Sequence, residues 1–230
     1  MPTVPLNTVS TVDAVCTSLE NDIYSLYYGP GAKIREKDLS DRYGVSRNTV
    51  REAVAYLLTS GLLVKYANRG VYVRKITIDD ICEIFHLREL LEGEAIRLIV
   101  ASQHMPEELL RAAEAVAAID PAQDWHESIH KDMAFHLLLV QCSGSQRLVR
   151  LYESILSEVK LCVYQSYDFI NQNFIPVSAE NSAHHMNILN AMQRGDLNGA
   201  LKYLSLHIAV ATSNYSAGYL KKESLQGRKK

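Results

Sequence analysis

The sequence has no uninterrupted run of about 18 apolar residues, which is the length a helix needs to cross a bilayer. Its first residues also lack a basic segment followed by an apolar one, the pattern that is typical of a secretory signal peptide. Internal repeats are absent as well. These absences predict a cytoplasmic protein without a membrane partner.

Cysteine is scarce, and its spacing argues against a zinc finger. The four thiols form no CxxC pair and no zinc-finger spacing, and they stand at Cys16, Cys82, Cys142 and Cys162. Each lies in an apolar helical context, which predicts buried free thiols in a reducing cytoplasm.

The sequence does contain enough apolar residues for a large domain or two modest ones, with 230 residues and 47% hydrophobic content. After Ile76 glycine becomes sparse and helical periodicity dominates, so we place a domain boundary at about residues 75–77. The formal net charge is −2, but the part up to Lys75 is mildly basic and the rest is acidic. We therefore predict a smaller domain at residues 1–75 and a larger one at residues 76–230.

The stretch from Gly44 to Val54 carries the pattern of a DNA-reading helix. Ser46 is a good N-cap, and the valines and leucines that follow recur on one buried stripe. The residues off this stripe, near the helix N-terminus, are Arg47, Asn48, Thr49 and Arg51. A recognition helix needs this arrangement, since its N-terminal residues meet base edges and phosphates in the major groove. A solvated helix start with two arginines accounts for the pattern alone equally well.

The flanking segments favour DNA binding. Two further helices are predicted upstream, an amphipathic one at about residues 12–26 and a shorter one at about 36–42, the latter ending before Gly44. Downstream, residues 62–66 and 71–74 read as two strands joined by a basic tip at 67–70. Three helices and a hairpin predict a winged helix-turn-helix. An arginine beside a glycine in such a tip can enter a narrow minor groove.

Several spaced elements of this region together resemble the N-terminal domain of the GntR family of bacterial transcription regulators. They are Pro30-Gly31, Leu39-Ser40, the stretch from Gly44 to Val54, Ser60-Gly61-Leu62 and Asn68-Arg69-Gly70. The resemblance places Lys37, Arg47, Thr49 and Arg51 on double-stranded DNA and Arg69-Gly70 at the wing tip. Thr49 stands where the family often has proline, and threonine there is similar to the fatty-acid regulator branch.

From Ile76 onward the pattern is helical and no strand is convincing. Asp79 or Asp80 can cap a helix whose apolar face is read as Ile84, Leu87, Leu91, Ala95 and Leu98. Five more helices are predicted after Pro106, at about 124–142, from about 146 to 166, at about 178–193 and from 196 to about 220. The fold class is therefore mainly α: an N-terminal winged helix-turn-helix and a C-terminal antiparallel all-α bundle.

Four side chains in the predicted bundle have the chemistry of a metal site. Asp132 and His136 are spaced i, i+4 on one face of the third predicted helix of the bundle, and the fifth and last helices carry His185 and His207. One carboxylate and three imidazoles can hold a divalent transition metal and leave a position open for a small molecule. The alternative is ordinary polar residues on amphipathic helices, because His126 and His130 also fall at i, i+4.

The same region resembles the FCD effector domain of the FadR subfamily of GntR regulators. The resemblance spans residues 79–215 and rests on Asp132 to His136, Ser143 to Leu148, His185 to Ala191 and Gly195-Asp196 ahead of His207. It implies zinc, nickel or a similar ion on Asp132, His136, His185 and His207, with His184 as an alternative ligand. The metal set argues against an acyl-coenzyme A ligand, and the size of the body resembles the VanR-like branch.

Arg88 is a candidate for binding the carboxylate of a small effector. It lies in a segment similar to the first effector-domain helix of the family, where the arginine often points into the cavity and can fork onto a carboxylate. The alternative is an intrahelical pair with Glu92, worth a few tenths of a kcal/mol (about 0.2–0.5).

These features together predict a ligand-responsive bacterial transcription regulator rather than an enzyme. We expect a homodimer that binds a palindromic operator, most often as a repressor, with DNA affinity set by a small carboxylate at the metal site. Two alternatives are a regulator that senses the metal itself and a metalloenzyme with a DNA-binding appendage. The latter lacks a spare group to act as a general base.

Overall fold

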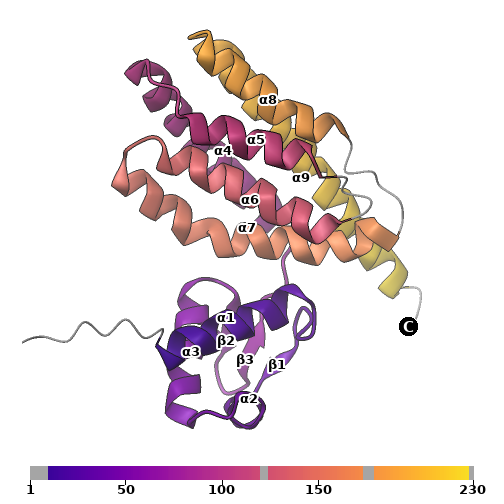
Figure 1. Cartoon of the computed structure of the whole chain (residues 1–230). Helices are drawn as coiled ribbons and strands as arrows, with labels where there is room; N and C mark the ends of the chain where they lie inside the picture. The colour runs from indigo at the N-terminus through magenta and orange to yellow at the C-terminus, as the bar shows by residue number, and fades with distance from the viewer. Residues whose placement is uncertain (1–9, 120–123, 173–178, 228–230) are drawn as a thin grey trace, which may run out of the picture. The chain divides into compact units, whose positions relative to one another are not determined.

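The computed structural model describes residues 10–119, 124–172 and 179–227. The chain divides into two compact units, with the division between Ile76 and Thr77 (Figure 1). Within the described ranges, no helix has both the length and the apolar character required to span a membrane.

The N-terminal unit is a winged helix-turn-helix, as predicted. Its elements are α1 (Thr11–Tyr24), β1 (Lys33–Ile34), α2 (Glu36–Tyr43), α3 (Arg47–Thr59), β2 (Leu63–Tyr66) and β3 (Gly70–Val73). The three strands form an antiparallel sheet in the order β1-β3-β2. Its core is built from the buried faces of α1 and α3, with Leu19, Val50 and Leu57 fully enclosed.

Two local predictions about this unit were wrong. The strand β1 was not predicted, because its two residues carry no period and become a strand only by pairing with β3, Ile34 opposite Val71. The first helix ends at Tyr24, and Leu26, predicted on its apolar face, lies beyond it with a φ of 62°.

The turn that leads into α3 is held as its sequence predicts. Gly44 has a φ of 66°, a conformation that glycine adopts without steric cost, and its N–H donates to the carbonyl of Ser40. Ser46 caps α3, its hydroxyl accepting from the backbone N–H of Thr49 at 3.2 Å. These two contacts fix the direction in which the N-terminus of α3 emerges.

One aspartate joins α1 to α2. The carboxylate of Asp22 accepts two hydrogen bonds from Arg42, at 2.8 and 2.9 Å, and a third from the hydroxyl of Tyr43 at 2.7 Å. The Arg42 guanidinium also lies over the ring of Tyr27, 3.9 Å from its centroid. A bidentate contact of this kind restricts orientation as well as distance, so α2 is held in a defined orientation against α1.

The described part of the C-terminal unit consists of six helices, as predicted. They are α4 (Ile78–Ser102), α5 (Glu107–Ala117), α6 (Trp125–Gln141), α7 (Gln146–Gln172), α8 (Ala179–Gln193) and α9 (Leu197–Gly227). Helix α9 packs against α4, α7 and α8, while α6 packs against α4, α5 and α7. Helix α4 also packs against α7 and α8, so it contacts α6, α7, α8 and α9 and is the central helix of this packing.

The buried face of α4 is rotated from the predicted one. Leu87 and Leu98, expected inside, are 40% and 37% exposed. Arg88 and Glu92 are instead 1% and 0% exposed, on a face with Ile81, Phe85 and Ile96. Apolar periodicity misplaced the face because a paired arginine and glutamate occupy two of its central positions.

Helix α4 begins with a capping box that was also predicted differently. Its N-cap is Thr77, whose hydroxyl accepts from the N–H of Asp80 at 3.1 Å. The Asp80 carboxylate in turn accepts from the backbone N–H of Thr77 at 2.8 Å. Asp80 is thus the third residue of the helix rather than its cap, and the reciprocal bonds define where the helix starts.

The capping box gives a matched test of local stability. Asp79→Ala and Asp80→Ala each remove one negative charge from the first turn of α4, but only Asp80→Ala breaks the reciprocal bonds. We expect Asp80→Ala to lower the free energy of unfolding by about 1 kcal/mol more than Asp79→Ala, measured by urea denaturation. Equal losses in the two variants would show that the box does not stabilise the helix.

The thiols only partly follow the prediction. Cys16 and Cys162 are buried, whereas Cys82 is exposed and Cys142 is half-buried; all four are free. Cys82 is exposed because it lies, like Leu87, outside the face of α4 that is buried in the structure.

Candidate functional site

Four of the residues predicted to read DNA lie at the N-terminal end of α3. Arg47, Asn48 and Arg51 on α3 are exposed, and Lys37 is exposed on α2. Thr49 is half-buried, with its hydroxyl 2.9 Å from that of Ser46. The exposed group is free of packing constraints, so these side chains can reorient toward base edges and phosphates.

Arg51 is held by a neighbouring acid. Its guanidinium lies 3.3 Å from the carboxylate of Glu36 on α2, and both side chains are exposed. An exposed pair of this kind contributes at most about 1 kcal/mol. Arg51 can therefore leave Glu36 for another partner at modest cost.

The wing tip is a tight turn with an exposed arginine. Asn68 and Gly70 have positive φ values of 60° and 102°, and Arg69 between them is exposed. A Cβ at Gly70 would lie 3.3 Å from Cε of Lys33, so a side chain there would meet both backbone strain and a close neighbour. Gly70 therefore shapes the tip, and Arg69 is the side chain it presents.

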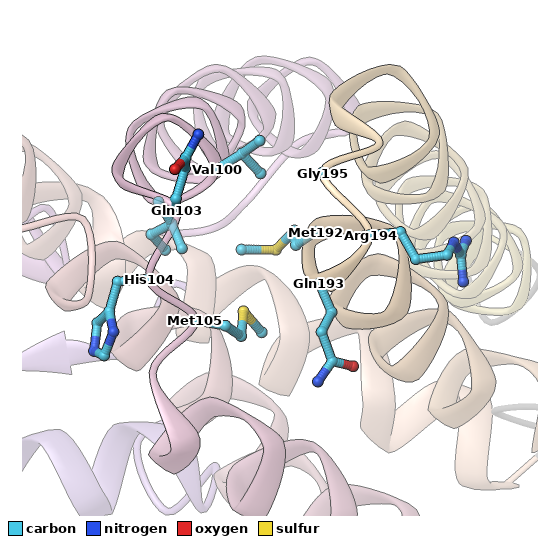
Figure 2. Close-up of a pocket in the computed structure, with 9 residues that line it drawn as sticks. Val100, Gln103, His104, Met105, Met192, Gln193, Arg194 and Gly195 are labelled. Carbon is cyan, nitrogen blue, oxygen red and sulfur yellow. The ribbon is translucent and has the colours of Figure 1, made fainter.

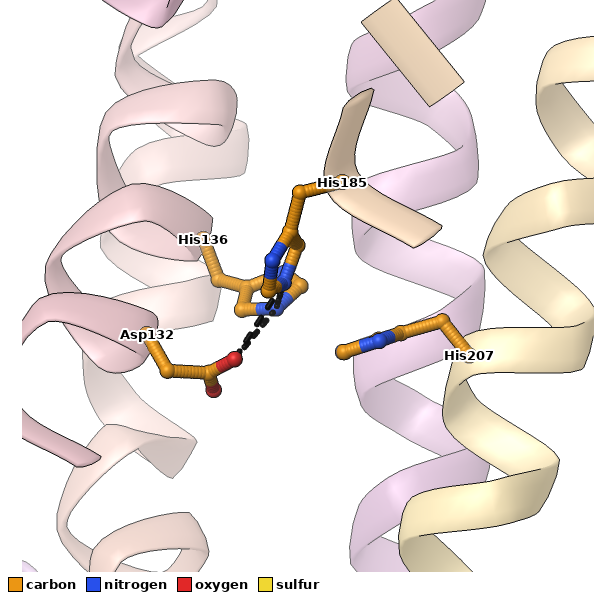
Figure 3. A group of neighbouring side chains, drawn as sticks. All are labelled: Asp132, His136, His185 and His207. Carbon is orange, nitrogen blue, oxygen red and sulfur yellow. Dashed lines mark hydrogen bonds and ion pairs between the residues drawn. The ribbon is translucent and has the colours of Figure 1, made fainter. Parts of the chain in front are cut away.

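In the C-terminal unit, the four predicted metal ligands come together (Figure 3). Each of Asp132, His136, His185 and His207 offers one ligand atom, and these atoms all lie within 4.8 Å of one another. Nε2 of His185 is 3.2 Å from Oδ1 of Asp132 and 3.1 Å from Nε2 of His136. The three histidines are buried, and Asp132 is 23% exposed.

The alternative ligand His184 lies outside this group. It is half-buried, and its ring meets that of His207 edge-on at a centroid distance of 6.0 Å. The ring of His207 instead stacks on His136 at 4.8 Å and tilts against His185 at 4.6 Å. The helix α8 thus turns His185, rather than its neighbour, toward α6 and α9.

Buried nitrogens in this cluster have the chemistry of cation ligands. Within the described ranges, neither ring nitrogen of His207 makes a hydrogen bond, nor does Nδ1 of His185. A buried polar atom without a partner is costly, and a neutral imidazole is a good ligand for a transition metal. The donor set of three imidazoles and one carboxylate therefore fits a divalent metal ion.

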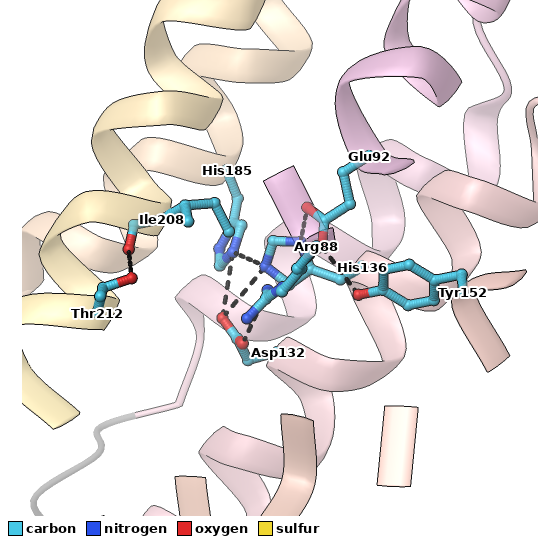
Figure 4. Close-up of polar contacts among 8 residues, drawn as sticks. All are labelled: Arg88, Glu92, Asp132, His136, Tyr152, His185, Ile208 and Thr212. Carbon is cyan, nitrogen blue, oxygen red and sulfur yellow. Dashed lines mark hydrogen bonds and ion pairs between the residues drawn. The ribbon is translucent and has the colours of Figure 1, made fainter. Parts of the chain in front are cut away.

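A buried network joins α4 to the cluster (Figure 4). Oε1 of Glu92 accepts from Nε of Arg88 at 2.7 Å and from the Tyr152 hydroxyl at 2.8 Å. Its other oxygen, Oε2, lies 2.7 Å from Nδ1 of His136. Arg88 is thus paired with Glu92, as the alternative interpretation held. Its Nη2 atom also lies 3.9 Å from Oδ2 of Asp132 and makes no hydrogen bond within the described residues.

The protonation of the cluster favours metal ligation at His185, His207 and Asp132. At His136, burial and Arg88 lower the pKa, but Glu92 and Asp132 outweigh them and raise it, so a metal ion would have to displace a proton there. Burial lowers the pKa of His207 well below its usual value, reinforced by His185 and His136, so this ring is neutral. Burial likewise lowers the pKa of His185. At Asp132, burial opposes ionisation, but His136 and His185 outweigh it and hold the carboxyl pKa well below its usual value. For Glu92, His136 and Arg88 outweigh burial and lower the pKa to about 2.

A cavity lies elsewhere in the unit. It has a volume of about 250 Å³ and opens between the end of α4 and the end of α8, and the metal cluster does not line it (Figure 2). Its lining mixes two methionines with amide, imidazole and guanidinium groups. The convergent, buried polar atoms are at the metal cluster rather than here, so the cluster is the stronger candidate site.

Comparison with known families decides the class of protein. Residues 11–73 match the gntR family of bacterial regulatory proteins, and residues 83–210 match the FCD domain. The protein belongs to the GntR family. Its FCD domain is the helical unit in which Asp132, His136, His185 and His207 come together. This GntR-family chain is therefore a transcription regulator rather than an enzyme.

Relatives of this GntR protein agree with that assignment. The HTH-type transcriptional repressor RspR of Escherichia coli K12 is 27% identical over 212 residues, covering 90% of this chain and 87% of RspR. A probable repressor of the D-xylose utilization operon of Paenarthrobacter nicotinovorans is 28% identical, with 82% of each chain covered.

Solved structures share the GntR-family architecture. A GntR structure from Rhodococcus sp. RHA1, assigned as a transcriptional regulator, matches with a TM-score of 0.72 at 25% identity. The match covers 90% of this chain and 98% of the Rhodococcus chain. An FCD domain solved in a metal-free form matches with a TM-score of 0.52 and 19% identity over 64% of this chain and 99% of its own, which bears on the fold alone.

Proposed function

We propose that this protein is a ligand-responsive repressor that binds a palindromic DNA operator as a homodimer in the bacterial cytoplasm. A small carboxylate at the metal cluster would set its affinity for the operator. The observation that carries the proposal is the convergence of Asp132, His136, His185 and His207 in a chain that also presents Arg47 and Arg51 on a recognition helix. One chain thus holds both a DNA-reading element and a candidate input site.

The donor set points to zinc or nickel. Imidazole suits Zn²⁺ and Ni²⁺, and one carboxylate completes a four-ligand set drawn from α6, α8 and α9. Bound there, the ion would act as a Lewis acid toward an oxygen ligand in any remaining coordination position. Because its ligands come from three helices, it would also hold these helices together.

The charges around the cluster explain why the effector should be an anion. With neutral imidazoles, Arg88 offsets Glu92, and Asp132 leaves one negative charge. A divalent cation turns this into one positive charge, which a monocarboxylate would neutralise. Uncompensated charge is expensive in a buried site, so the metal-loaded site favours an anionic partner.

Arg88 is placed to contribute to such binding. Its Nε is engaged by Glu92, while its buried Nη2 has no hydrogen bond within the described residues. That atom lies 3.9 Å from the Asp132 carboxylate, on the cluster side of the network. An effector carboxylate bound beside Asp132 would supply the missing acceptor, so pairing with Glu92 and binding of an effector are compatible.

The solvent face of α4 supports a dimer. Leu87, Leu90 and Leu98 are all exposed there, an unusual concentration of leucine on one helix. Glu83 and Arg97 stand seven residues to either side of Leu90. Antiparallel packing of α4 against a second copy, centred on Leu90, would place each glutamate near an arginine of the other chain. A second copy is therefore the occupant we propose for this face.

The dimer proposal predicts a clear effect of one substitution. Leu90→Glu places two like charges at the centre of the α4 pair, so it should convert the dimer into a monomer in sedimentation velocity. Leu220→Glu introduces the same change at another exposed leucine, on α9, and should leave the dimer intact. A dimeric Leu90→Glu protein would place the interface elsewhere.

Regulation by a carboxylate can be tested directly on the full-length protein. An operator would first be selected from a random DNA pool, and binding measured by fluorescence anisotropy with metal-stripped and zinc- or nickel-loaded protein. Small carboxylates such as sugar acids, hydroxy acids and dicarboxylates would then be added. A change in DNA affinity that requires both metal and carboxylate supports the proposal. A response to metal alone would favour a metal-sensing regulator instead.

A further inference from the structure

We propose that Glu92 is the positioning residue for the metal site, holding His136 in the one tautomer that can bind the ion through Nε2. This inference rests on the proposed metal site and adds to it a residue on α4, a helix that supplies none of the four ligands. It also assigns Tyr152 on α7 as the group that holds Glu92 in place.

The hydrogen bonds around Glu92 determine where the proton of His136 lies. Arg88 Nε and the Tyr152 hydroxyl both approach Oε1, and Nδ1 of His136 approaches Oε2 at 2.7 Å. An ionised carboxylate only accepts hydrogen bonds. Nδ1 must therefore carry the proton and donate it to Glu92. In the neutral ring, this leaves the lone pair on Nε2.

That lone pair points at the other candidate ligands. Nε2 of His136 lies 3.1 Å from Nε2 of His185 and 3.7 Å from Oδ1 of Asp132. Figure 4 shows His136 between Glu92 on one side and the cluster on the other. Glu92 thus turns the ring so that its basic nitrogen faces the ion's position.

His136 differs in this respect from the other two histidines. Over the described residues, Nδ1 of His185 and both ring nitrogens of His207 make no hydrogen bond. Only His136 among the three has a carboxylate on the nitrogen that faces away from the cluster. Outer partners of this kind orient a ligand and raise its basicity, and losing one typically weakens metal binding by about 10–100-fold.

The decisive variant is Glu92→Gln, which keeps the size of the side chain but adds a donor. Its amide can donate to Nδ1 and so favour the tautomer with the proton on Nε2, which leaves no lone pair on the nitrogen that faces the cluster. We expect zinc affinity, measured by competition with a chelator, to fall by about 10–100-fold. Glu94→Gln is the control, because Glu94 is an exposed glutamate on the same helix. It should leave zinc affinity unchanged.

A second readout does not depend on metal. The ¹⁵N shifts of His136 in the metal-free wild type should report a protonated Nδ1 and an unprotonated Nε2, and Glu92→Gln should reverse or mix these. Tyr152→Phe removes one bond to Glu92 and leaves the ring in the core, so its loss of zinc affinity should be smaller and in the same direction.

The outcomes separate this inference from the proposed function. A wild-type protein that binds no zinc or nickel would overturn the metal site, while the tautomer measurement would still decide whether Glu92 positions His136. A wild type that binds zinc, with Glu92→Gln binding equally well, would overturn the positioning role alone. Should Glu92→Gln fail to fold, a wild-type His136 protonated on Nε2, or full zinc affinity in Tyr152→Phe, would overturn it.

Discussion

His207→Ala should lower the affinity of the protein for zinc or nickel by about 100-fold or more, the largest effect we expect. Removing a direct ligand must cost at least as much as removing an outer partner, which costs about 10–100-fold. His207 makes no hydrogen bond through either nitrogen within the described residues, so the change breaks no such bond. Competition with a chelator and elemental analysis of the purified protein would both measure the effect.

The neighbouring histidine provides the control. His184→Ala removes an imidazole from α8 close to the cluster but outside the four-ligand group, so metal affinity should remain. If His184→Ala lost metal affinity and His207→Ala retained it, His184 would be the metal ligand in place of His207. Thermal unfolding of the metal-free variants would separate loss of binding from loss of fold.

Arg47→Ala or Arg51→Ala should each weaken operator binding by about 1–3 kcal/mol, or roughly 5- to 150-fold. Both side chains are exposed at the N-terminal end of α3, where a recognition helix meets the major groove. Because neither is buried, the fold should be unaffected. Fluorescence anisotropy with a selected operator, at a stated salt concentration, would give the affinities.

The nature of the loss would distinguish base reading from phosphate contact. An arginine that reads a base should relax the sequence preference, while one that binds phosphate should weaken all DNA and reduce the salt dependence by about one charge. Arg111→Ala, in an exposed pair with Glu107 on α5, is a matched control in the other unit. Unchanged operator affinity in both α3 variants would refute the recognition-helix assignment.

The helix-turn-helix could be predicted because its determinants are local. Gly44 and Ser46 mark the end of one helix and the start of the next by backbone chemistry that works over three or four residues. The strand at Lys33 and Ile34 could not be predicted, because it depends on partners almost 40 residues away. Local signals in a sequence identify helices and turns. They do not show which distant segments pair with each other.

The four candidate metal ligands could be predicted from the sequence, whereas Glu92, which contacts His136, could not. Asp132 and His136 share a face by spacing, and the resemblance to the FCD domain selected His185 and His207. Glu92 gave no comparable signal, because an arginine and glutamate at i, i+4 are typical of a solvated helix face. Its contact with His136 joins residues 44 positions apart, and only the packed bundle brings them together. The sequence points to Glu92 only through Arg88, whose alternative role is an intrahelical pair with Glu92.

The ion pair between Glu36 and Arg51 bears on how the protein finds its operator in a genome. If Arg51 meets DNA as proposed, a carboxylate beside α3 would repel every phosphate that approaches, whatever the base sequence, and would compete for Arg51. Such an acid would weaken binding to the vast excess of unrelated sites as much as to the operator. Only where Arg51 gains a base contact would that loss be recovered. Glu36 would then set the dwell time on wrong sequences, so the search for the right one stays fast.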